Sequence, residues 1–378
     1  MLFAFALIWL LLILYSFSLQ DLNLTLYNFP FWNPIRNFFQ TLGHYRRPLS
    51  SLLFLTLISL FIYLYFYLVK ANRQTKPSQK YFKLASLFIF TGILAYPMFS
   101  HDIFNYLFNA KMVWVYKANP HIQTALNYLS DPWTRFMHNI HTAAPYAYGW
   151  TLISLIPGLI SLTDNFTLSF WSMKLFISLF WLGQLYILYR LVKKLYPRQL
   201  WRWWLFALSP LVLIETLIIG HNDVTMMFPA LVSYWFLLKS KKLLDRQFTL
   251  ALFFLVLSVG IKYATIILLP LYFIKSFRPK IDLPSWAAIL LFALMFIRPG
   301  QMHSWYFIWA FSFAVLSQNR WLISLFTSLS LGAILRYLPY IYYGNWDSPV
   351  YLLRNLIWVI SLFFTPFLKR LLYPSNKQ

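Results

Sequence analysis

Two short stretches of the chain join an acidic residue to a histidine at the end of an apolar run. His101-Asp102 follows one run, and His221-Asn222-Asp223 follows another that Glu215 interrupts. A carboxylate at a water–lipid boundary is partly desolvated, which raises its basicity, and it can then take a proton from a hydroxyl group. The chain has only nine acidic residues, so these acids are the first candidates for general base catalysis.

Each of these acids also has a structural explanation. Asp102 could cap the helix that begins after it, because Asp is favoured at the N-cap position. His221-Asn222-Asp223 could form a polar turn that caps the following helix. Glu215 is harder to explain in this way, since a carboxylate inside an apolar run needs a partner. We do not expect a metal site, because one histidine with carboxylates on a single turn is a poor ligand set.

Cations occur at two further places where a purely apolar helix would not need them. Lys262 lies in the middle of the apolar stretch 248–274, where an ammonium group requires an anionic partner or a water-filled cavity. Arg298 precedes Gln301-Met302-His303-Ser304-Trp305, and Arg is suited to bidentate phosphate recognition. The alternative for Arg298 is a side chain that extends from a helix end to the lipid headgroups. The cations favour an anionic ligand such as a phosphate.

The composition indicates the elements that must position these residues. Hydrophobic residues make up 60% of the 378 residues and charged residues only 11%, whereas a soluble domain has about 25% charged residues. The apolar runs are about 15 to 22 residues long, which is the length that crosses a bilayer. The sequence therefore predicts an all-α, polytopic transmembrane helical bundle. The absence of cysteine excludes disulfides and thiol catalysis.

Basic residues between the apolar runs predict the orientation of the bundle. Most lie in the short segments 70–83, 190–202, 239–246, 275–280 and 369–370. Basic loops of this kind stay on the cytoplasmic side, which also makes the C-terminus cytoplasmic. The net charge of +23 is thus spread over loops and does not form one basic stripe, so no nucleic-acid partner is expected.

With the basic loops inside, the runs fit a single integral membrane domain, 1–378, of about 10 to 12 spans. The count includes a half-depth hairpin at 248–274 and an interfacial or re-entrant helix at 150–162. Such a backbone is tolerated only where protein or a cavity covers it. The weakly apolar segment 101–150, with interfacial helices to about residue 163, is expected to cover a site on the outer side.

Two functional classes fit these features. A carboxylate and several cations at one face fit glycosyl transfer from a phosphate-linked donor, because the cations offset the charge of the departing phosphate. The alternative is a transporter or flippase of a lipid-linked saccharide or another amphiphile. A transporter predicts paired charges near the bilayer midplane and discontinuous helices in symmetric halves. The clustering of polar residues at one face favours the enzyme.

Several motifs in order resemble GT-C glycosyltransferases, and most closely the bacterial mannosyltransferases that depend on polyprenol-phosphate-mannose. The first outer loop of that family is matched by Asp102-Ile103-Phe104-Asn105-Tyr106, Ala118-Asn119-Pro120-His121 and Pro145-Tyr146-Ala147-Tyr148-Gly149. Later parts of the family are matched by Gly220-His221-Asn222-Asp223, Gly260-Ile261-Lys262-Tyr263 and Gln301-Met302-His303-Ser304-Trp305-Tyr306. The similarity covers roughly residues 96–309. His121 stands where the family commonly has Tyr, and this difference bears on which donor and which acceptor the protein uses.

The resemblance implies a GT-C-like fold and an inverting transfer of a hexose, often mannose, from a polyprenyl-phosphate sugar. It implies no metal and no cofactor, and places Asp102 at the catalytic centre. Whether Asp102 or His303 takes the acceptor proton stays open. The candidates for binding the donor or the acceptor are His101, Tyr106, Glu215, His221, Asn222, Asp223, Lys262, Arg298, Gln301 and Trp305.

The expected partners and location follow from the same resemblance. They are the polyprenyl-phosphate sugar donor, a glycan, glycolipid or protein acceptor, and membrane lipid. The expected location is the bacterial plasma membrane, with the active site on its outer face.

Overall fold

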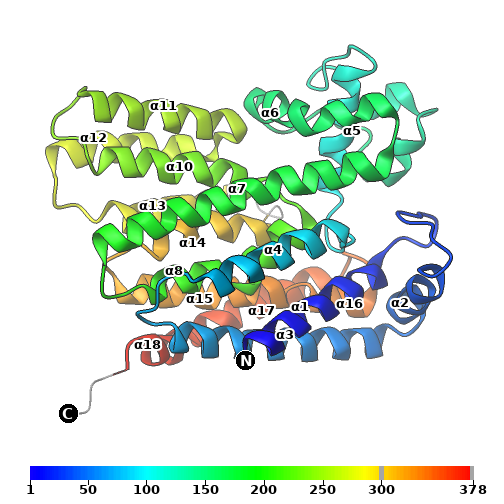
Figure 1. The fold of residues 1–378 in the computed structure, drawn as a ribbon, viewed down its shortest axis with the longest axis horizontal. Helices are drawn as coiled ribbons and strands as arrows, with labels where there is room; N and C mark the ends of the chain where they lie inside the picture. Colours follow the sequence, from blue (N-terminus) through cyan, green and yellow to red (C-terminus); the bar gives the residue numbers. More distant parts are fainter. Residues whose placement is uncertain (298–301, 375–378) are drawn as a thin grey trace.

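The computed structural model describes residues 1–297 and 302–374, and every regular element within them is a helix. This confirms the all-α prediction. The helices run roughly side by side in two groups, joined by the long helix α7 (Phe166–Leu195) that crosses the middle of the molecule (Figure 1).

The first group packs the N-terminal helices against the C-terminal ones. It contains α1 (Leu2–Ser16), α3 (Arg47–Ala71), α4 (Gln79–Leu94), α15 (Arg320–Leu335), α16 (Leu338–Tyr343), α17 (Val350–Phe363) and α18 (Thr365–Leu372). Stacked aromatic rings hold α1 and α3 together, with the centroids of Phe5 and Phe61 4.4 Å apart. These rings are buried away from water, which is the largest favourable contribution that aromatic side chains make to packing.

The second group surrounds the central helices. It contains α10 (Asp223–Leu237), α11 (Arg246–Ile261), α12 (Leu269–Phe277), α13 (Leu283–Ala293) and α14 (Phe307–Ala314), with the short helices η6 (Tyr263–Leu268), η7 (Leu294–Phe296) and η8 (Ser304–Tyr306). The break between α11 and η6 falls at Lys262, whose backbone is extended. The sequence therefore located the break in the 248–274 stretch correctly.

The polypeptide between the two groups contains an irregular turn that matters for the site. After α8 (Trp201–Ala207) and α9 (Pro210–Leu213), residues 214–219 form the π-helix η5 (Ile214–Ile219). The wide π-turn ends at Gly220, which has φ +90°, a conformation that glycine adopts without steric cost. Isolated π-turns are frequent at functional sites.

The segment after α4 forms a layer of short helices at one end of the bundle. It contains α5 (Asp102–Trp114), η2 (Ala125–Tyr128), η3 (Pro132–Phe136), α6 (Tyr148–Gly158) and η4 (Leu159–Thr163). Lys111 of α5 fastens the layer, because its ammonium lies 2.7 Å from carboxylate oxygens of both Asp131 and Asp164. The amphipathic helix α2 (Asn33–Tyr45) lies at the same end (Figure 1).

The chain is an integral membrane protein, and its helices explain how the count of spans differs from the expectation. In the described residues four helices are long and apolar enough to cross a bilayer, or six if each of two bent pairs is one span. Five further apolar helices have only 10–17 residues. We expected 10 to 12 spans. The expected number is higher because hydropathy alone counts an apolar run as a full span even where turns break it into shorter helices.

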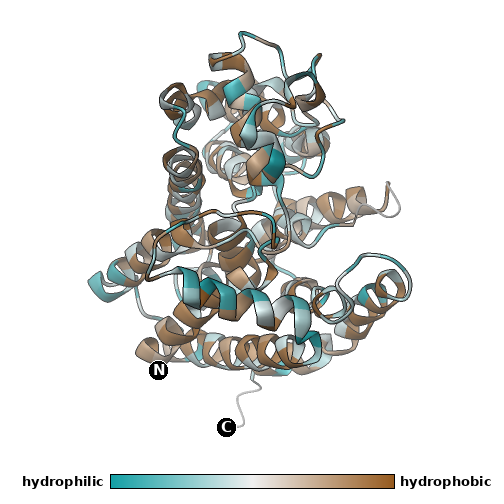
Figure 2. Ribbon diagram, turned by 90° about the vertical axis from the view of Figure 1, so that its right-hand side faces the viewer, coloured by the Kyte–Doolittle hydropathy of each residue, from teal (hydrophilic) through white to brown (hydrophobic). Residues whose placement is uncertain are grey.

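The basic connections gather at one end of the bundle and the short-helix layer at the other. The α3–α4, α7–α8, α10–α11 and α12–α13 connections and α18 lie on the left in Figure 1, whereas α2 and α5 lie on the right. Figure 2 faces the right-hand end and shows hydrophilic residues concentrated on α2 and on the segments around α5. The basic connections and the polar short-helix layer thus lie at opposite ends of the helical bundle.

Candidate active site

A cavity of about 930 Å³ lies beneath the short-helix layer. One wall comes from the start of α5 and from the loop before α6, and the opposite wall from η7, η8, α14, α15 and α17. Its polar lining consists of Ser100, His101, Asp102, Asn105, Asn109, His138, Asn139, Thr142, Tyr146, Lys262, Tyr263, His303, Ser304, Trp305, Tyr306, Trp309, Arg336, Tyr337, Trp346 and Arg354. Residues from both groups of helices meet there, which makes it the candidate active site.

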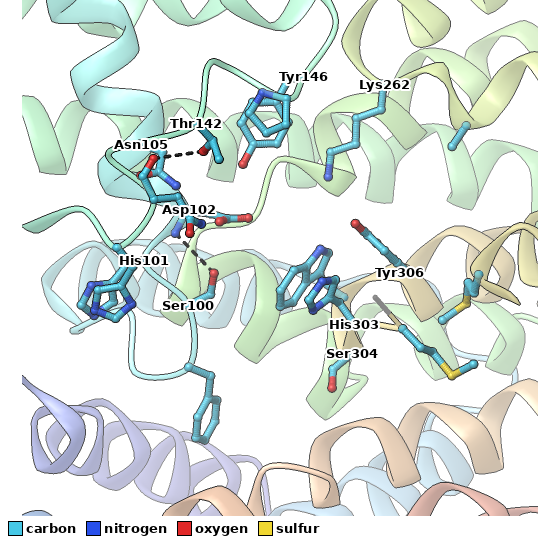
Figure 3. A pocket seen from close by; sticks show the side chains of 18 of the residues that line it. Ser100, His101, Asp102, Asn105, Thr142, Tyr146, Lys262, His303, Ser304 and Tyr306 are labelled. Atoms are coloured by element: carbon cyan, nitrogen blue, oxygen red, sulfur yellow. Dashed lines mark hydrogen bonds between the residues drawn. The ribbon is translucent and has the colours of Figure 1, made fainter. Parts of the chain in front are cut away.

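Asp102 occupies the first position of α5 and faces this cavity (Figure 3). Its backbone N–H donates to Ser100 Oγ at 3.3 Å, and the residue at the N-cap position is His101. The N-cap interpretation of Asp102 is therefore wrong, and its carboxylate is available to the cavity. Burial raises the pKa of Asp102 to about 6, although Lys262 and a hydrogen bond from Tyr146 act in the opposite direction.

His101 lines the cavity, but both of its ring nitrogens form hydrogen bonds within the protein, which gives it a structural role. Its Nε2 accepts a hydrogen bond from Tyr96 Oη at 2.9 Å, and its Nδ1 donates to the carbonyl of Phe136 at 3.0 Å. Burial lowers the pKa of His101 to about 3, and nearby His138 acts in the same direction. The neutral ring therefore fastens the short-helix layer to the end of α4 beside Asp102.

Glu215 and His221 lie in a second layer behind Asp102. Both are almost completely buried and neither lines the cavity. Glu215 accepts a hydrogen bond from Tyr337 Oη at 2.8 Å, and its other oxygen lies 3.0 Å from His221 Nδ1. His221 Nε2 lies 3.9 Å from Asp102 Oδ2. The sequence-based assignment of both residues to direct substrate binding does not fit this position.

The π-helix that carries Glu215 is held by a buried lysine that the sequence analysis missed. Lys174 of α7 is 1% exposed and donates to the carbonyls of Gly92, Ala95 and Ile218 at 2.6–2.8 Å. These carbonyls lie at the end of α4 and within η5, so one ammonium group connects three elements. An ionisable residue inside a long apolar helix is the signal that points to it.

Asp223 and Lys262 form a buried ion pair beside the cavity. The ammonium of Lys262 lies 2.8 Å from Asp223 Oδ1, which also accepts from Trp309 Nε1 at 2.5 Å. Lys262 lines the cavity, whereas Asp223 is fully buried behind it. The sequence analysis required an anionic partner or a water-filled cavity for Lys262, and the structure provides the anionic partner and places Lys262 at a cavity. The positive charge of Lys262 is thus largely compensated.

Two other predicted binding residues are buried behind the wall. Tyr106 packs edge-on against Tyr146 and Trp150, with ring centroids 5.1 and 4.9 Å away. Asn222 stands at the N-cap position of α10, but its side chain forms no cap hydrogen bond. Neither Tyr106 nor Asn222 lines the cavity, so direct contact with a substrate is not supported for either.

The short-helix layer meets the helix break at an unusually close backbone contact. The N–H of Ala147 donates to the carbonyl of Ile261 at 3.3 Å. A Cβ atom on Gly149 would overlap the carbonyl group of Gly260, so only glycine fits at position 149. This contact places Tyr146 and Lys262 side by side at the top of Figure 3.

On the opposite wall, three aromatic rings form a column. The indole of Trp305 stacks on His221 on one side, with centroids 3.9 Å apart, and on His303 on the other, at 4.3 Å. Burial lowers the pKa of His303 to about 4, and the nearby cations Arg354, Arg336 and Lys262 act in the same direction. Both His303 and Trp305 line the cavity, so this predicted turn is part of the site wall.

The remaining predicted residues, Arg298 and Gln301, lie outside the described residues. The structure instead brings Arg336 and Arg354 to the cavity, which the sequence analysis missed. Arg336 is buried and donates to the carbonyl of Met302 at 3.0 Å. It interrupts the apolar run 322–340, which is a signal for it. Arg354 stacks over Tyr351 at 4.9 Å and is the only charged residue of the apolar helix α17, which is the same kind of signal.

Within the described residues, no group of three or more His, Cys, Asp or Glu side chains is arranged to hold a metal ion. The cavity instead combines one available carboxylate, several neutral polar groups and two arginines. Such a set can take a proton from a hydroxyl group on one side and stabilise an anionic leaving group on the other.

Comparison with known proteins gives the family. Searches of curated proteins and of solved structures found no match to the chain. Residues 20–278 match a family model described as alpha-(1→6)-mannopyranosyltransferase, N-terminal domain, which covers well over half of the chain. The matched residues include Asp102, Glu215 and Lys262, and the second wall of the cavity follows them in sequence. The chain therefore belongs to this family of mannosyltransferases, which are GT-C-type membrane enzymes.

Proposed function

We propose that this protein transfers mannose from a polyprenyl-phosphate mannose to a hydroxyl group of an acceptor, with inversion, at the outer face of the membrane. Membership of the mannosyltransferase family supports the sugar and the reaction class. The donor, the stereochemistry and the side of the membrane are supported by the arrangement of charges around the cavity.

The observation that carries the proposal is the separation of Asp102 from the cations across the cavity. Asp102 and His303 lie on different sides of the cavity in Figure 3, and the cations close enough to lower the pKa of His303 include Arg336, directly after α15, and Arg354 of α17. In an inverting displacement the acceptor oxygen attacks the anomeric carbon from the side opposite to the leaving group. A base and an anion-binding site on opposite walls fit this requirement.

Asp102 is the better of the two candidate bases. Its pKa is raised to about 6, whereas the pKa of His303 is lowered to about 4. Both groups are thus unprotonated at pH 7, and the carboxylate binds a proton more strongly than the imidazole. In the proposed step Asp102 takes the acceptor proton, the acceptor oxygen forms the new bond to the anomeric carbon, and the bond to the phosphate oxygen breaks.

The two arginines are the groups proposed to bind the donor phosphate. Lys262 is already paired with Asp223 and therefore contributes less net charge to the cavity. A guanidinium group can bind a phosphate through two parallel hydrogen bonds. The leaving polyprenyl phosphate would thus remain bound as an anion while the sugar is transferred.

An apolar edge of the cavity supports a lipid-linked donor. Tyr263 and Ile297 line the cavity and are 63% and 69% exposed on the molecular surface. Tyr263 begins η6 directly after the break at Lys262, and Ile297 directly follows η7. A polyprenyl chain could lie along this edge while its phosphate reaches the arginines.

The charge pattern supports catalysis at the outer face. The basic connections lie at the end of the bundle opposite to α2 and the short-helix layer (Figure 1). Basic loops remain on the cytoplasmic side, so the layer that covers the cavity would face outward.

The proposal is tested by offering the purified protein three radiolabelled donors together with a mannose-containing acceptor. The donors are polyprenyl-phosphate mannose, polyprenyl-phosphate glucose and a nucleoside-diphosphate mannose. We expect label to enter the acceptor from polyprenyl-phosphate mannose alone, and an α-linked product formed from the β-linked donor. Transfer from the nucleotide sugar alone, or retention of configuration, would contradict the proposal.

A further inference from the structure

Behind the candidate base, two buried side chains form a chain of contacts that direct substrate binding does not explain. Glu215 bonds to His221 Nδ1 at 3.0 Å, and His221 Nε2 lies 3.9 Å from Asp102 Oδ2. All three residues come from different elements, namely η5, the turn after it and the start of α5. These contacts lead from Glu215 in the protein interior, through His221, to Asp102 at the cavity.

The orientation of the His221 ring is fixed by a hydrogen bond at Nδ1 and by stacking on Trp305. A carboxylate of Glu215 accepts the hydrogen of Nδ1, which leaves Nε2 as the acceptor of the neutral ring. The ring stacks on Trp305 with centroids 3.9 Å apart. Its Nε2 is buried, has no hydrogen-bond partner among the described residues, and points toward Asp102. An unpaired acceptor in this position can accept a hydrogen bond from Asp102 once that carboxylate is protonated.

We propose that Glu215 and His221 are positioning residues that stabilise the protonated form of Asp102 during mannosyl transfer. This inference rests on the proposed function, because it takes Asp102 as the base. When Asp102 receives the proton of the acceptor hydroxyl, its new O–H can donate to His221 Nε2. Glu215 Oε2, as the acceptor of the hydrogen on Nδ1, holds the ring in the required tautomer.

The proton balance is complete without another reactant. The acceptor loses one proton, Asp102 gains it, and the polyprenyl phosphate leaves with the electrons of the broken glycosidic bond. The carboxylate of Asp102 is 23% exposed, so the proton can return to water through the cavity after the product leaves. His221 is 1% exposed and has no route of its own to solvent.

Other titratable groups also face these residues and set the direction of the expected pH effects. Those that act on Asp102 or His221 are Asp223, Lys262, Tyr106, Tyr146 and His303. Burial lowers the pKa of His221, and Lys262 and His303 act in the same direction. The ring is therefore neutral at rest, as the proposed hydrogen bond from protonated Asp102 requires.

The test uses two substitutions that preserve shape. Glu215→Gln keeps the size and shape of the side chain, but its amide can turn an N–H₂ group toward His221 Nδ1 and therefore no longer fixes the tautomer of the ring. His221→Asn keeps a donor for Glu215 and removes the acceptor that faces Asp102. The matched controls are Asp245→Asn, at a helix N-cap where Asn serves equally well, and His44→Asn on α2. Neither control residue lines the cavity.

Both test variants should lower kcat at least about 10-fold while the KM for the donor stays within about twofold. In Glu215→Gln the acidic limb of kcat/KM should move to lower pH by about one unit, because Asp102 loses stabilisation of its protonated form. Thermal unfolding in detergent establishes that each variant is folded, and either variant alone suffices for the test.

A folded Glu215→Gln protein with the wild-type kcat and pH profile would overturn the inference. Asp102→Asn, measured in the same assay, separates this failure from failure of the proposed function. If Asp102→Asn is inactive while the Glu215 and His221 variants behave as wild type, only the positioning role is wrong. If Asp102→Asn remains fully active, the proposed function is itself wrong.

Discussion

Three acids, of which Glu215 and Asp223 are fully buried and Asp102 only partly, lie at the candidate site, and their partners distinguish their roles. Asp223 is paired with Lys262 and Trp309, and Glu215 with Tyr337 and His221. Asp102 instead has a carboxylate that reaches the cavity. An acid that is already neutralised by a close cation is a weak base, so Asp102 is the one suited to take a proton from a substrate.

The raised pKa of Asp102 predicts a specific pH dependence. The base must be ionised to act, and its pKa is raised from 3.8 to about 6. We therefore expect kcat/KM to fall as the pH drops through about 6 and to level off above pH 7, measured by initial rates in nanodiscs. A midpoint near pH 4, the ordinary value for Asp, would contradict the burial of this carboxylate.

Arg354 is predicted to act mainly on the donor. Because it lines the cavity near His303, Arg354→Gln should raise the KM for polyprenyl-phosphate mannose about 10-fold, which corresponds to the loss of about 1.4 kcal/mol of binding. Steady-state rates at varied donor concentration measure this change. Lys117→Gln removes an exposed cation outside the cavity and serves as the control. Equal donor KM for both variants would exclude Arg354 from donor binding.

The residues that sequence reasoning found and missed differ in how much local signal they carry. Asp102, His303 and Lys262 stand beside turns or inside apolar runs, where a charge is conspicuous. Arg336 carries the same kind of signal. The second-layer position of Glu215 could not be predicted, because it depends on a π-turn and on packing against Tyr337, 122 residues later.

At the scale of elements, the site depends on a close contact between α6 and α11. Gly149 at the start of α6 touches the backbone of Gly260, two residues before the break at Lys262. The sequence predicted a break in this hairpin and a helix near residues 150–162. It could not predict that the two elements meet, because contact between distant segments has no local pattern.

Matched glycine substitutions test this contact. A Cβ on Gly149 would overlap the carbonyl of Gly260, whereas a Cβ on Gly260 would lie 3.9 Å from the Cα of Gly149. Gly149→Ala should therefore destabilise the protein by about 1 to 3 kcal/mol and reduce transfer, because Tyr146 and Lys262 shift. Gly260→Ala should leave both unchanged. Thermal unfolding and transfer rates of the two variants measure the difference, and equal behaviour would refute the close contact.

At the scale of the whole molecule, charged residues are distributed unevenly between the two ends of the helical bundle. The basic connections gather at one end, and the cavity lies beneath the short-helix layer at the other (Figures 1 and 2). The sequence predicted the all-α fold and this sorting from composition and loop charge. The number of spans was less predictable, because hydropathy alone does not reveal where an apolar run bends.

The cysteine-free chain offers a direct measurement of orientation. Ile122→Cys places a thiol on the short-helix layer, at a residue that is 76% exposed. Lys241→Cys places one in an exposed basic connection. In intact cells a membrane-impermeant maleimide should label Ile122→Cys and not Lys241→Cys, whereas both should react after the membrane is permeabilised. The reverse pattern in intact cells would place the cavity on the cytoplasmic side.

The most direct test of the central claim compares mannosyl transfer by the wild-type protein, Asp102→Asn and the control Asp347→Asn, an exposed acid outside the cavity. Each protein is purified, checked for thermal unfolding, and incubated with radiolabelled polyprenyl-phosphate mannose and acceptor. We expect wild type and Asp347→Asn to transfer mannose equally, and Asp102→Asn to be slower by a factor on the order of 100 or more. Folded Asp102→Asn protein that transfers mannose at the wild-type rate would contradict the claim that this carboxylate is the catalytic base.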